Sequence, residues 1–82
     1  MEAKQNKDKV SIELSNEEAL VLLNWLFRFN EGDNPDLFED QSEERILWDL
    51  EASLEKITSA TFEKNYSEVL ERAREKVRDE TV

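Results

Sequence analysis

The sequence predicts a mainly α protein, a small bundle of three main helices with one short turn of helix and a short N-terminal strand. Two observations lead to this prediction. A capping residue stands three positions before a glutamate at Ser15, Asp40 and Asn65, which is the spacing of a helix N-terminal capping box. After each of these starts, apolar residues recur every three or four positions. Because 82 residues provide material for one core, we expect a single helical domain over residues 10–82.

The N-terminal segment contains one strand pattern. Residues 1–9 are mostly charged or small and polar without a periodic apolar face, so we predict a disordered lead-in. Val10, Ile12 and Leu14 then alternate with polar residues, as in a strand with one buried side. The backbone of a strand needs hydrogen-bonding partners. Two alternatives are open: pairing with residues 57–62, or pairing of Val10, Ile12 and Leu14 with the same strand of a second chain in a homodimer.

The first helix pattern is apolar around most of its circumference, so we expect it at the centre of the fold. Gly32 is predicted to end this helix in the left-handed conformation, and Pro35 is suited to begin the short helical turn. The second predicted helix follows the cap at Asp40. Its apolar stripe is expected to face the central helix and consists of Ile46, Leu47, Leu50, Ser53, Leu54 and Ile57. In the third predicted helix the residues at helical spacing are Phe62, Tyr66, Val69, Leu70, Ala73 and Val77. The apolar sides of all three helices are expected to share one core.

Residue types that support most catalytic and metal chemistry are missing. The chain contains no histidine and no cysteine, which are the usual general bases, nucleophiles and zinc ligands at neutral pH. The segment 31–36 is rich in oxygen ligands but lacks the ligand spacing of a calcium loop. We therefore expect no enzyme activity, no metal and no cofactor.

The longest apolar stretch, residues 19–27, is interrupted by Asn24 and is far shorter than the roughly 20 residues that cross a bilayer. The N-terminal residues show no apolar run typical of a signal peptide. These observations predict a cytoplasmic protein that does not bind membranes.

Charge is the most unusual property of the sequence. The formal net charge is −10, and residues 31–51 contain nine acids and one base. Direct nucleic-acid binding is disfavoured, because it depends on lysine and arginine neutralising phosphates. A concentrated negative field favours a basic protein partner instead. The predicted partner-binding residues are the acids of this segment and a nearby aromatic: Asp33, Asp36, Glu39, Asp40, Glu43, Glu44, Trp48 and Glu51.

Trp48 falls on the side of the second helix opposite its apolar stripe. A tryptophan on an acidic face is suited to anchor a partner protein. The alternative interpretation is that the Trp48 side chain is covered, either by residues 10–14 or by the second chain of a homodimer.

Three runs, EEALVLLNWLFRFNE, FEDQSEERILWDLEASLEK and NYSEVLERAREKVRDE, cover residues 17–31, 38–56 and 65–80. In these runs the chain resembles a group of short, acidic, uncharacterised bacterial proteins. The resemblance implies bacterial origin and a fold of one strand and three main helices, and it implies no role for any residue.

The function predicted from these observations is that of a non-catalytic, acidic protein-binding module, of an inhibitor, immunity or antitoxin kind, that engages a basic partner surface. Two alternatives are open: a self-associating homodimer with a structural role, and a mimic of nucleic-acid charge.

Overall fold

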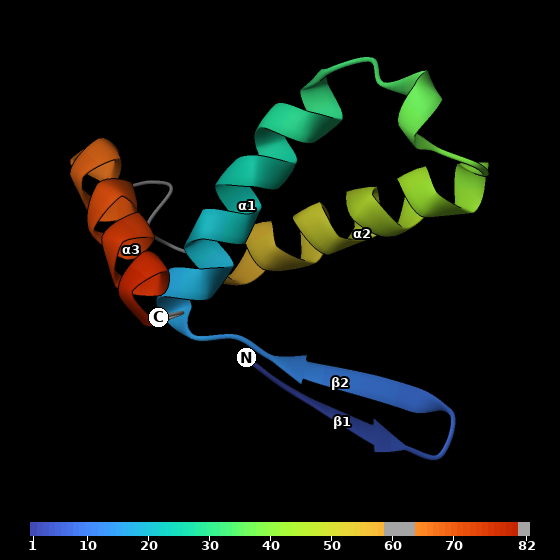
Figure 1. Ribbon diagram of the computed structural model, residues 1–82, viewed down its shortest axis with the longest axis horizontal. Helices are drawn as coiled ribbons and strands as arrows, with labels where there is room; N and C mark the ends of the chain where they lie inside the picture. The colour runs from blue at the N-terminus through green and yellow to red at the C-terminus, as the bar shows by residue number, and fades with distance from the viewer. Residues whose placement is uncertain (59–63, 81–82) are drawn as a thin grey trace.

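The computed structural model describes residues 1–58 and 64–80 and confirms a mainly helical fold (Figure 1). Its elements, in chain order, are β1 (Glu2–Asn6), β2 (Lys9–Glu13), α1 (Asn16–Glu31), a 3-10 helix (Pro35–Leu37), α2 (Gln41–Ile57) and α3 (Tyr66–Glu80). No helix in these two ranges combines the length and the apolar character that a membrane span requires.

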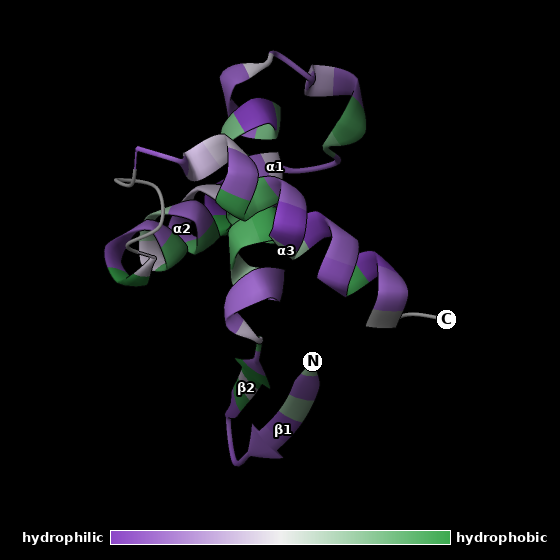
Figure 2. Cartoon of the chain, turned by 90° about the vertical axis from the view of Figure 1, so that its left-hand side faces the viewer, coloured by the Kyte–Doolittle hydropathy of each residue, from purple (hydrophilic) through white to green (hydrophobic). Residues whose placement is uncertain are grey.

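Helix α1 is the centre of the fold, as predicted. The capping box forms at its start: the Glu18 N–H donates to Ser15 Oγ at 3.0 Å, and the Ser15 N–H donates to Glu18 Oε1 at 2.9 Å. The principal helix contacts are those of α1 with α2 and of α1 with α3. Figure 2 shows the apolar residues gathered where the three helices meet, with polar residues toward their outer ends.

The buried residues form two clusters that share α1, instead of the single core predicted. Leu20 packs with Leu70 and Ala73 of α3. Leu23 and Leu26 pack with Leu54 of α2. Because α1 is apolar on two sides, it buries a different face against each neighbour.

The predicted stripe of α2 is correct for three of its residues, Leu47, Leu50 and Leu54, and wrong for the other three. Leu47 and Leu50 pack against the core and Leu54 is buried, whereas Ser53 is exposed. Ile46 is 63% exposed and Ile57 is 77% exposed. Because α2 has its principal contact with one helix, α1, the described residues cover only part of its apolar face.

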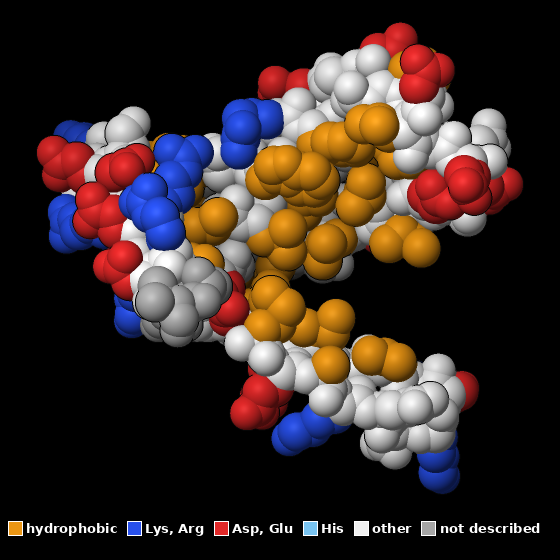
Figure 3. All heavy atoms as spheres, in the orientation of Figure 1, with side chains coloured by type: hydrophobic (Ala, Val, Ile, Leu, Met, Phe, Trp, Pro, Cys, Tyr) orange, Lys and Arg blue, Asp and Glu red, His pale blue; other side chains and the backbone are white. Residues whose placement is uncertain are grey.

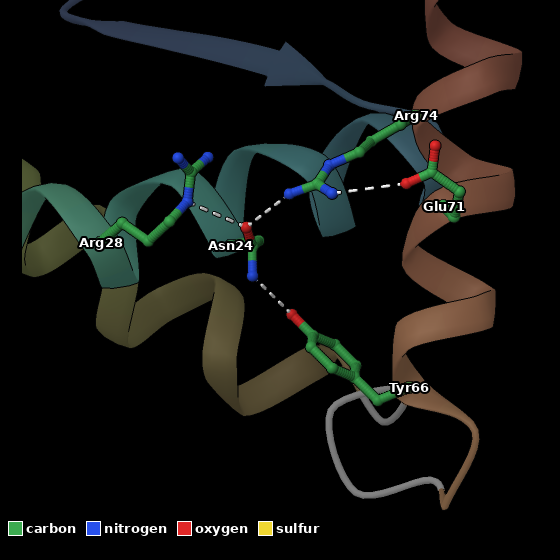
Figure 4. Close-up of polar contacts among 5 residues, drawn as sticks. All are labelled: Asn24, Arg28, Tyr66, Glu71 and Arg74. Carbon is green, nitrogen blue, oxygen red and sulfur yellow. Dashed lines mark hydrogen bonds and ion pairs between the residues drawn. The ribbon is translucent and has the colours of Figure 1, made fainter.

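A seam of polar side chains joins α1 to α3 (Figure 4). The Asn24 side chain donates through Nδ2 to the Tyr66 hydroxyl at 3.1 Å. Its Oδ1 accepts from Arg74 at 3.1 Å and from Arg28 at 3.2 Å. Arg74 also forms an ion pair with Glu71, at 3.5 Å. The polar side of α1 is therefore part of a helix interface.

The prediction of a disordered lead-in was wrong, because residues 2–6 form β1. This strand pairs antiparallel with β2, and Gln5 lies opposite Val10 while Ala3 lies opposite Ile12. The connecting turn places Lys7 at φ 55°, the one non-glycine residue with positive φ among those described. The hairpin thus supplies the pairing partner of β2 within the chain. In the alternative partner, residues 57–62, Ile57 belongs to α2 and Thr58 is its C-cap, whereas residues 59–62, which include Phe62, lie outside the described residues.

The conformation of Gly32 also differs from the prediction. Its φ of −80° and ψ of 161° are extended, and its N–H donates to the Phe29 carbonyl at 3.2 Å. Helix α1 therefore ends by an abrupt change to extended backbone, which directs the chain into the 3-10 helix at Pro35.

Candidate protein-binding site

Most of the net negative charge lies at one end of the molecule, since residues 31–51 hold nine acids and one base while the net charge of the chain is −10. This end consists of the C-terminal part of α1, the 3-10 helix and the N-terminal part of α2. In Figure 3 acidic side chains gather over this end, at the right of the view, whereas over α3, at the left, lysine and arginine side chains are interspersed with acidic ones. The fold thus preserves in space the charge separation of the sequence.

Three of the predicted carboxylates are used to hold the structure together. Asp40 caps α2 by accepting from the Ser42 N–H at 2.8 Å. Hydrogen bonding from the Ser42 side chain, and then from its backbone N–H, lowers the pKa of Asp40. Glu43 accepts from the Glu39 N–H at 3.1 Å. Glu51 accepts from the Asn30 side chain at 2.8 Å and so ties α2 to α1. Removing these carboxylates would disturb the fold as well as the surface.

The other four acids, Asp33, Asp36, Glu39 and Glu44, have carboxylates that form no hydrogen bond or ion pair within residues 1–58 and 64–80. Asp33, Asp36 and Glu39 are exposed, and Glu44 is half-buried. Neutralising them therefore changes the surface charge without removing an observed contact.

An aromatic cluster lies beside these acids. Trp25 stacks on Phe29 with ring centroids 4.8 Å apart and an interplanar angle of 26°. Phe29 meets the edge of Phe38 at 5.8 Å and 89°. These offset-stacked and edge-to-face arrangements are the favourable ones for aromatic rings. The cluster joins α1 to the residue that follows the 3-10 helix.

A hollow of about 230 Å³ opens between the aromatic cluster and α2. Three aromatic side chains, two carboxylates and two asparagine side chains meet there; the lining residues are Phe29, Asn30, Gly32, Asp33, Asn34, Phe38, Glu44 and Trp48. Aromatic faces and carboxylates both attract cations, the first through the ring quadrupole and the second through charge. The arrangement is suited to a lysine or arginine side chain.

The hollow brings together three of the predicted site residues, Asp33, Glu44 and Trp48. Trp48 is 49% exposed, so the N-terminal strand does not shelter it. The remaining predicted acids belong to the same acidic end or to the α1–α2 contact. Sequence reasoning missed Phe29 and Phe38 as part of the site.

Part of that missed information was present in the sequence. Trp25 and Phe29 are four residues apart on one helix, which is the spacing at which side chains meet. The contact of Phe29 with Phe38 depends on the path of the chain through the 3-10 helix, and local spacing does not reveal it.

A second, larger hollow of about 850 Å³ lies where the base of the hairpin meets the three helices. Ile12, Leu14, Leu54 and Ile57 contribute to its apolar wall. At its polar side Lys76 donates to Glu17 at 3.0 Å, and this contact lowers the pKa of Glu17. We do not assign the predicted site to this hollow, because none of the predicted acidic residues lines it.

Within the described part of the chain, no group of three or more acidic side chains is placed to share a metal ion. Comparison with known proteins adds no assignment: no protein-family model, no curated protein and no solved structure matches the chain.

Proposed function

We propose that this protein acts without catalysis, as an acidic module that binds the basic surface of another protein. The observation that supports the proposal is the aromatic hollow with Asp33 and Glu44 in its wall and the internally unpaired carboxylates of Asp36 and Glu39 at the same end. A lysine or arginine side chain of the partner enters the hollow, and other basic groups of the partner face the surrounding acids.

In the proposal, charge and packing contribute to different steps of binding: charge to the association rate and aromatic packing to the dissociation rate. Carboxylates concentrated at one end attract a cationic partner over about a Debye length, roughly 10 Å at 0.1 M salt, and raise its association rate. Aromatic side chains provide the buried contact that slows dissociation, because hot spots of protein interfaces are enriched in tryptophan and tyrosine. Trp48, which is half-exposed beside Glu44, has this role in the proposal.

The partner is then a protein whose basic face is neutralised on binding. In this proposal the protein is of an inhibitor, immunity or antitoxin kind and covers a basic surface of its partner. We place the interaction in the cytoplasm, in keeping with the lack of cysteine.

The test compares two variants of equal net charge. The site variant neutralises the four internally unpaired acids: Asp33→Asn, Asp36→Asn, Glu39→Gln and Glu44→Gln. The control variant neutralises four exposed acids elsewhere: Asp8→Asn, Glu55→Gln, Glu75→Gln and Asp79→Asn. Binding of a lysine- and arginine-rich peptide is measured by fluorescence anisotropy at low and at moderate salt.

We expect the site variant to associate with the peptide about tenfold more slowly than the wild type at low salt, and the control to be much less affected. A third variant, Trp48→Ala, keeps the charge and is expected to raise the dissociation rate. Equal losses in the site and control variants show that net charge alone drives binding and contradict the proposed site. A pull-down from host lysate with the wild type and the site variant then identifies the natural partner.

A further inference from the structure

The N-terminal hairpin has surfaces that the described residues leave without a partner. β1 and β2 form a two-stranded sheet, and the outer edge of each strand has no neighbouring strand in residues 1–58 and 64–80. All residues of both strands are exposed, including Val10 at 66% and Ile12 at 60%. An isolated two-stranded hairpin is marginally stable in water, and an open strand edge is a template for pairing.

The outer edge of β2 is complementary to a second copy of itself. An antiparallel pairing centred on Ser11 aligns all five residues of the strand. In this register Lys9 lies opposite Glu13 of the second copy, so two pairs of opposite charge form across the two-fold axis. Val10 lies opposite Ile12 of the second copy, and this apolar pair also occurs twice. Direct cross-strand pairs of both kinds stabilise a sheet.

The outer edge of β1 lacks this complementarity. The corresponding pairing of β1 is centred on Lys4 and places two lysines directly opposite each other. Like charges in direct opposition destabilise a sheet. The charge pattern therefore selects β2 over β1 as the edge that pairs.

We propose that two copies of the chain associate through β2, by an antiparallel two-fold pairing centred on Ser11, to form a four-stranded sheet in the order β1-β2-β2-β1. The two-fold axis of such a pairing is perpendicular to the sheet and leaves both apolar faces on the same side. Ile12 lines the hollow that α1, α2 and α3 share with the hairpin, so this apolar side is the side of the helices in each copy. The pattern of apolar side chains along the hairpin in Figure 3 agrees with this placement.

The helices of both copies consequently lie on the apolar side of the joined sheet. The polar side, with Lys9, Ser11 and Glu13, remains in solvent. Residues 1–14 carry three acids and three bases, so the interface brings together segments without net charge. The acidic end of each copy is not part of this surface, and the inference is independent of the proposed function.

A symmetric cross-link tests the register directly. Ser11 lies opposite Ser11 of the second copy, at the separation of roughly 4.5 to 5.5 Å found between facing residues of antiparallel strands, which a disulfide can bridge. The chain has no cysteine, so Ser11→Cys introduces a single thiol. The control is Lys4→Cys, an equally exposed position on the same face of the sheet but on β1. We expect mild oxidation to cross-link Ser11→Cys nearly completely and Lys4→Cys poorly, on a non-reducing gel.

Charge exchange tests the same interface without a covalent bond. Lys9→Glu alone and Glu13→Lys alone each place like charges opposite each other twice, and each is expected to weaken the dimer about tenfold or more. An equimolar mixture of the two variants restores opposite charges and is expected to form a heterodimer. Light scattering measures the molar mass of the wild type, of each variant and of the mixture, and this mass is compared with the 9.7 kDa of one chain.

A wild-type protein that stays monomeric at high micromolar concentration overturns the proposal. A dimer that neither single exchange weakens, or equal cross-linking of the two cysteine variants, also overturns it, because the copies then associate through another surface.

Discussion

At the residue scale, Asn24 shows how one amide can connect two helices. Its side chain uses the donor and the acceptor of the amide at once, toward Tyr66 and toward Arg74 (Figure 4). Arg28 shares the same acceptor oxygen from one turn further along α1. An aliphatic side chain at this position leaves three polar groups to find other partners.

We expect Asn24→Ala to lower the free energy of unfolding by about 1 to 2 kcal/mol, because it removes a partly buried hydrogen-bond network. Tyr66→Phe removes a single hydroxyl and is expected to cost less. Since the two groups are bonded to each other, the double variant should be less destabilised than the sum of the single variants. Urea denaturation gives the three values, and strict additivity would argue against the Asn24 to Tyr66 bond contributing to stability.

At the element scale, the capping box of α1 links helix formation to pH. The Ser15 N–H donates to the carboxylate of Glu18, and this hydrogen bond is the main reason that the pKa of Glu18 lies below its ordinary value of 4.5. The pKa of Asp40 is lowered for a similar reason at the start of α2, where its carboxylate accepts hydrogen bonds from Ser42. Both helix starts therefore depend on ionised carboxylates.

Because the folded-state pKa of Glu18 is lower than its unfolded value, ionised Glu18 stabilises the fold above about pH 4.5, and this contribution is lost as the pH falls through the folded-state pKa. We expect Glu18→Gln to be less stable than the wild type at pH 7 and to approach it at pH 3. Urea denaturation at the two pH values measures the difference. Glu55→Gln is the control, since Glu55 is an exposed glutamate that caps neither α1 nor α2. A difference that is unchanged at pH 3 would contradict a role for the ionised form.

At the scale of the whole molecule, charge is distributed unevenly. The acidic end holds nine acids and one base in residues 31–51, whereas α3 carries ion pairs such as Glu68 to Arg72 at 3.7 Å and Glu71 to Arg74 at 3.5 Å. Exposed ion pairs contribute little to stability. Repulsion within the acidic end is therefore the larger electrostatic effect on the fold, and it opposes folding.

This imbalance makes stability depend on salt. We expect the melting temperature of the wild type to rise with sodium chloride concentration, because screening weakens the repulsion among the acids. The variant with Asp33, Asp36, Glu39 and Glu44 neutralised should show a smaller rise than the control variant with the same net charge. Thermal melts followed by circular dichroism compare them. A wild-type melting temperature that falls with salt would show that ion pairs outweigh the repulsion.

Which helices form, and where they begin, could be predicted because these features are local. Ser15 and Asp40 cap their helices as their spacing predicts, and the core positions Leu20, Leu23 and Leu26 follow the helical period. The acidic end could also be predicted, since its acids fall within one segment of the sequence, residues 31–51. β1 was missed because residues 2–6 are mostly polar, and their pairing depends on β2 and on the turn at Lys7.

The sequence by itself determined the helices, their caps and the location of the negative charge, because each depends on residues within a turn or two of one another. The tertiary structure alone decided that the apolar residues divide between two faces of α1, that Phe38 meets Phe29, and that Asp40 and Glu51 are bonded internally while Asp33 and Glu44 line a hollow. These outcomes depend on the path between the helices, which sets distances that no local pattern encodes.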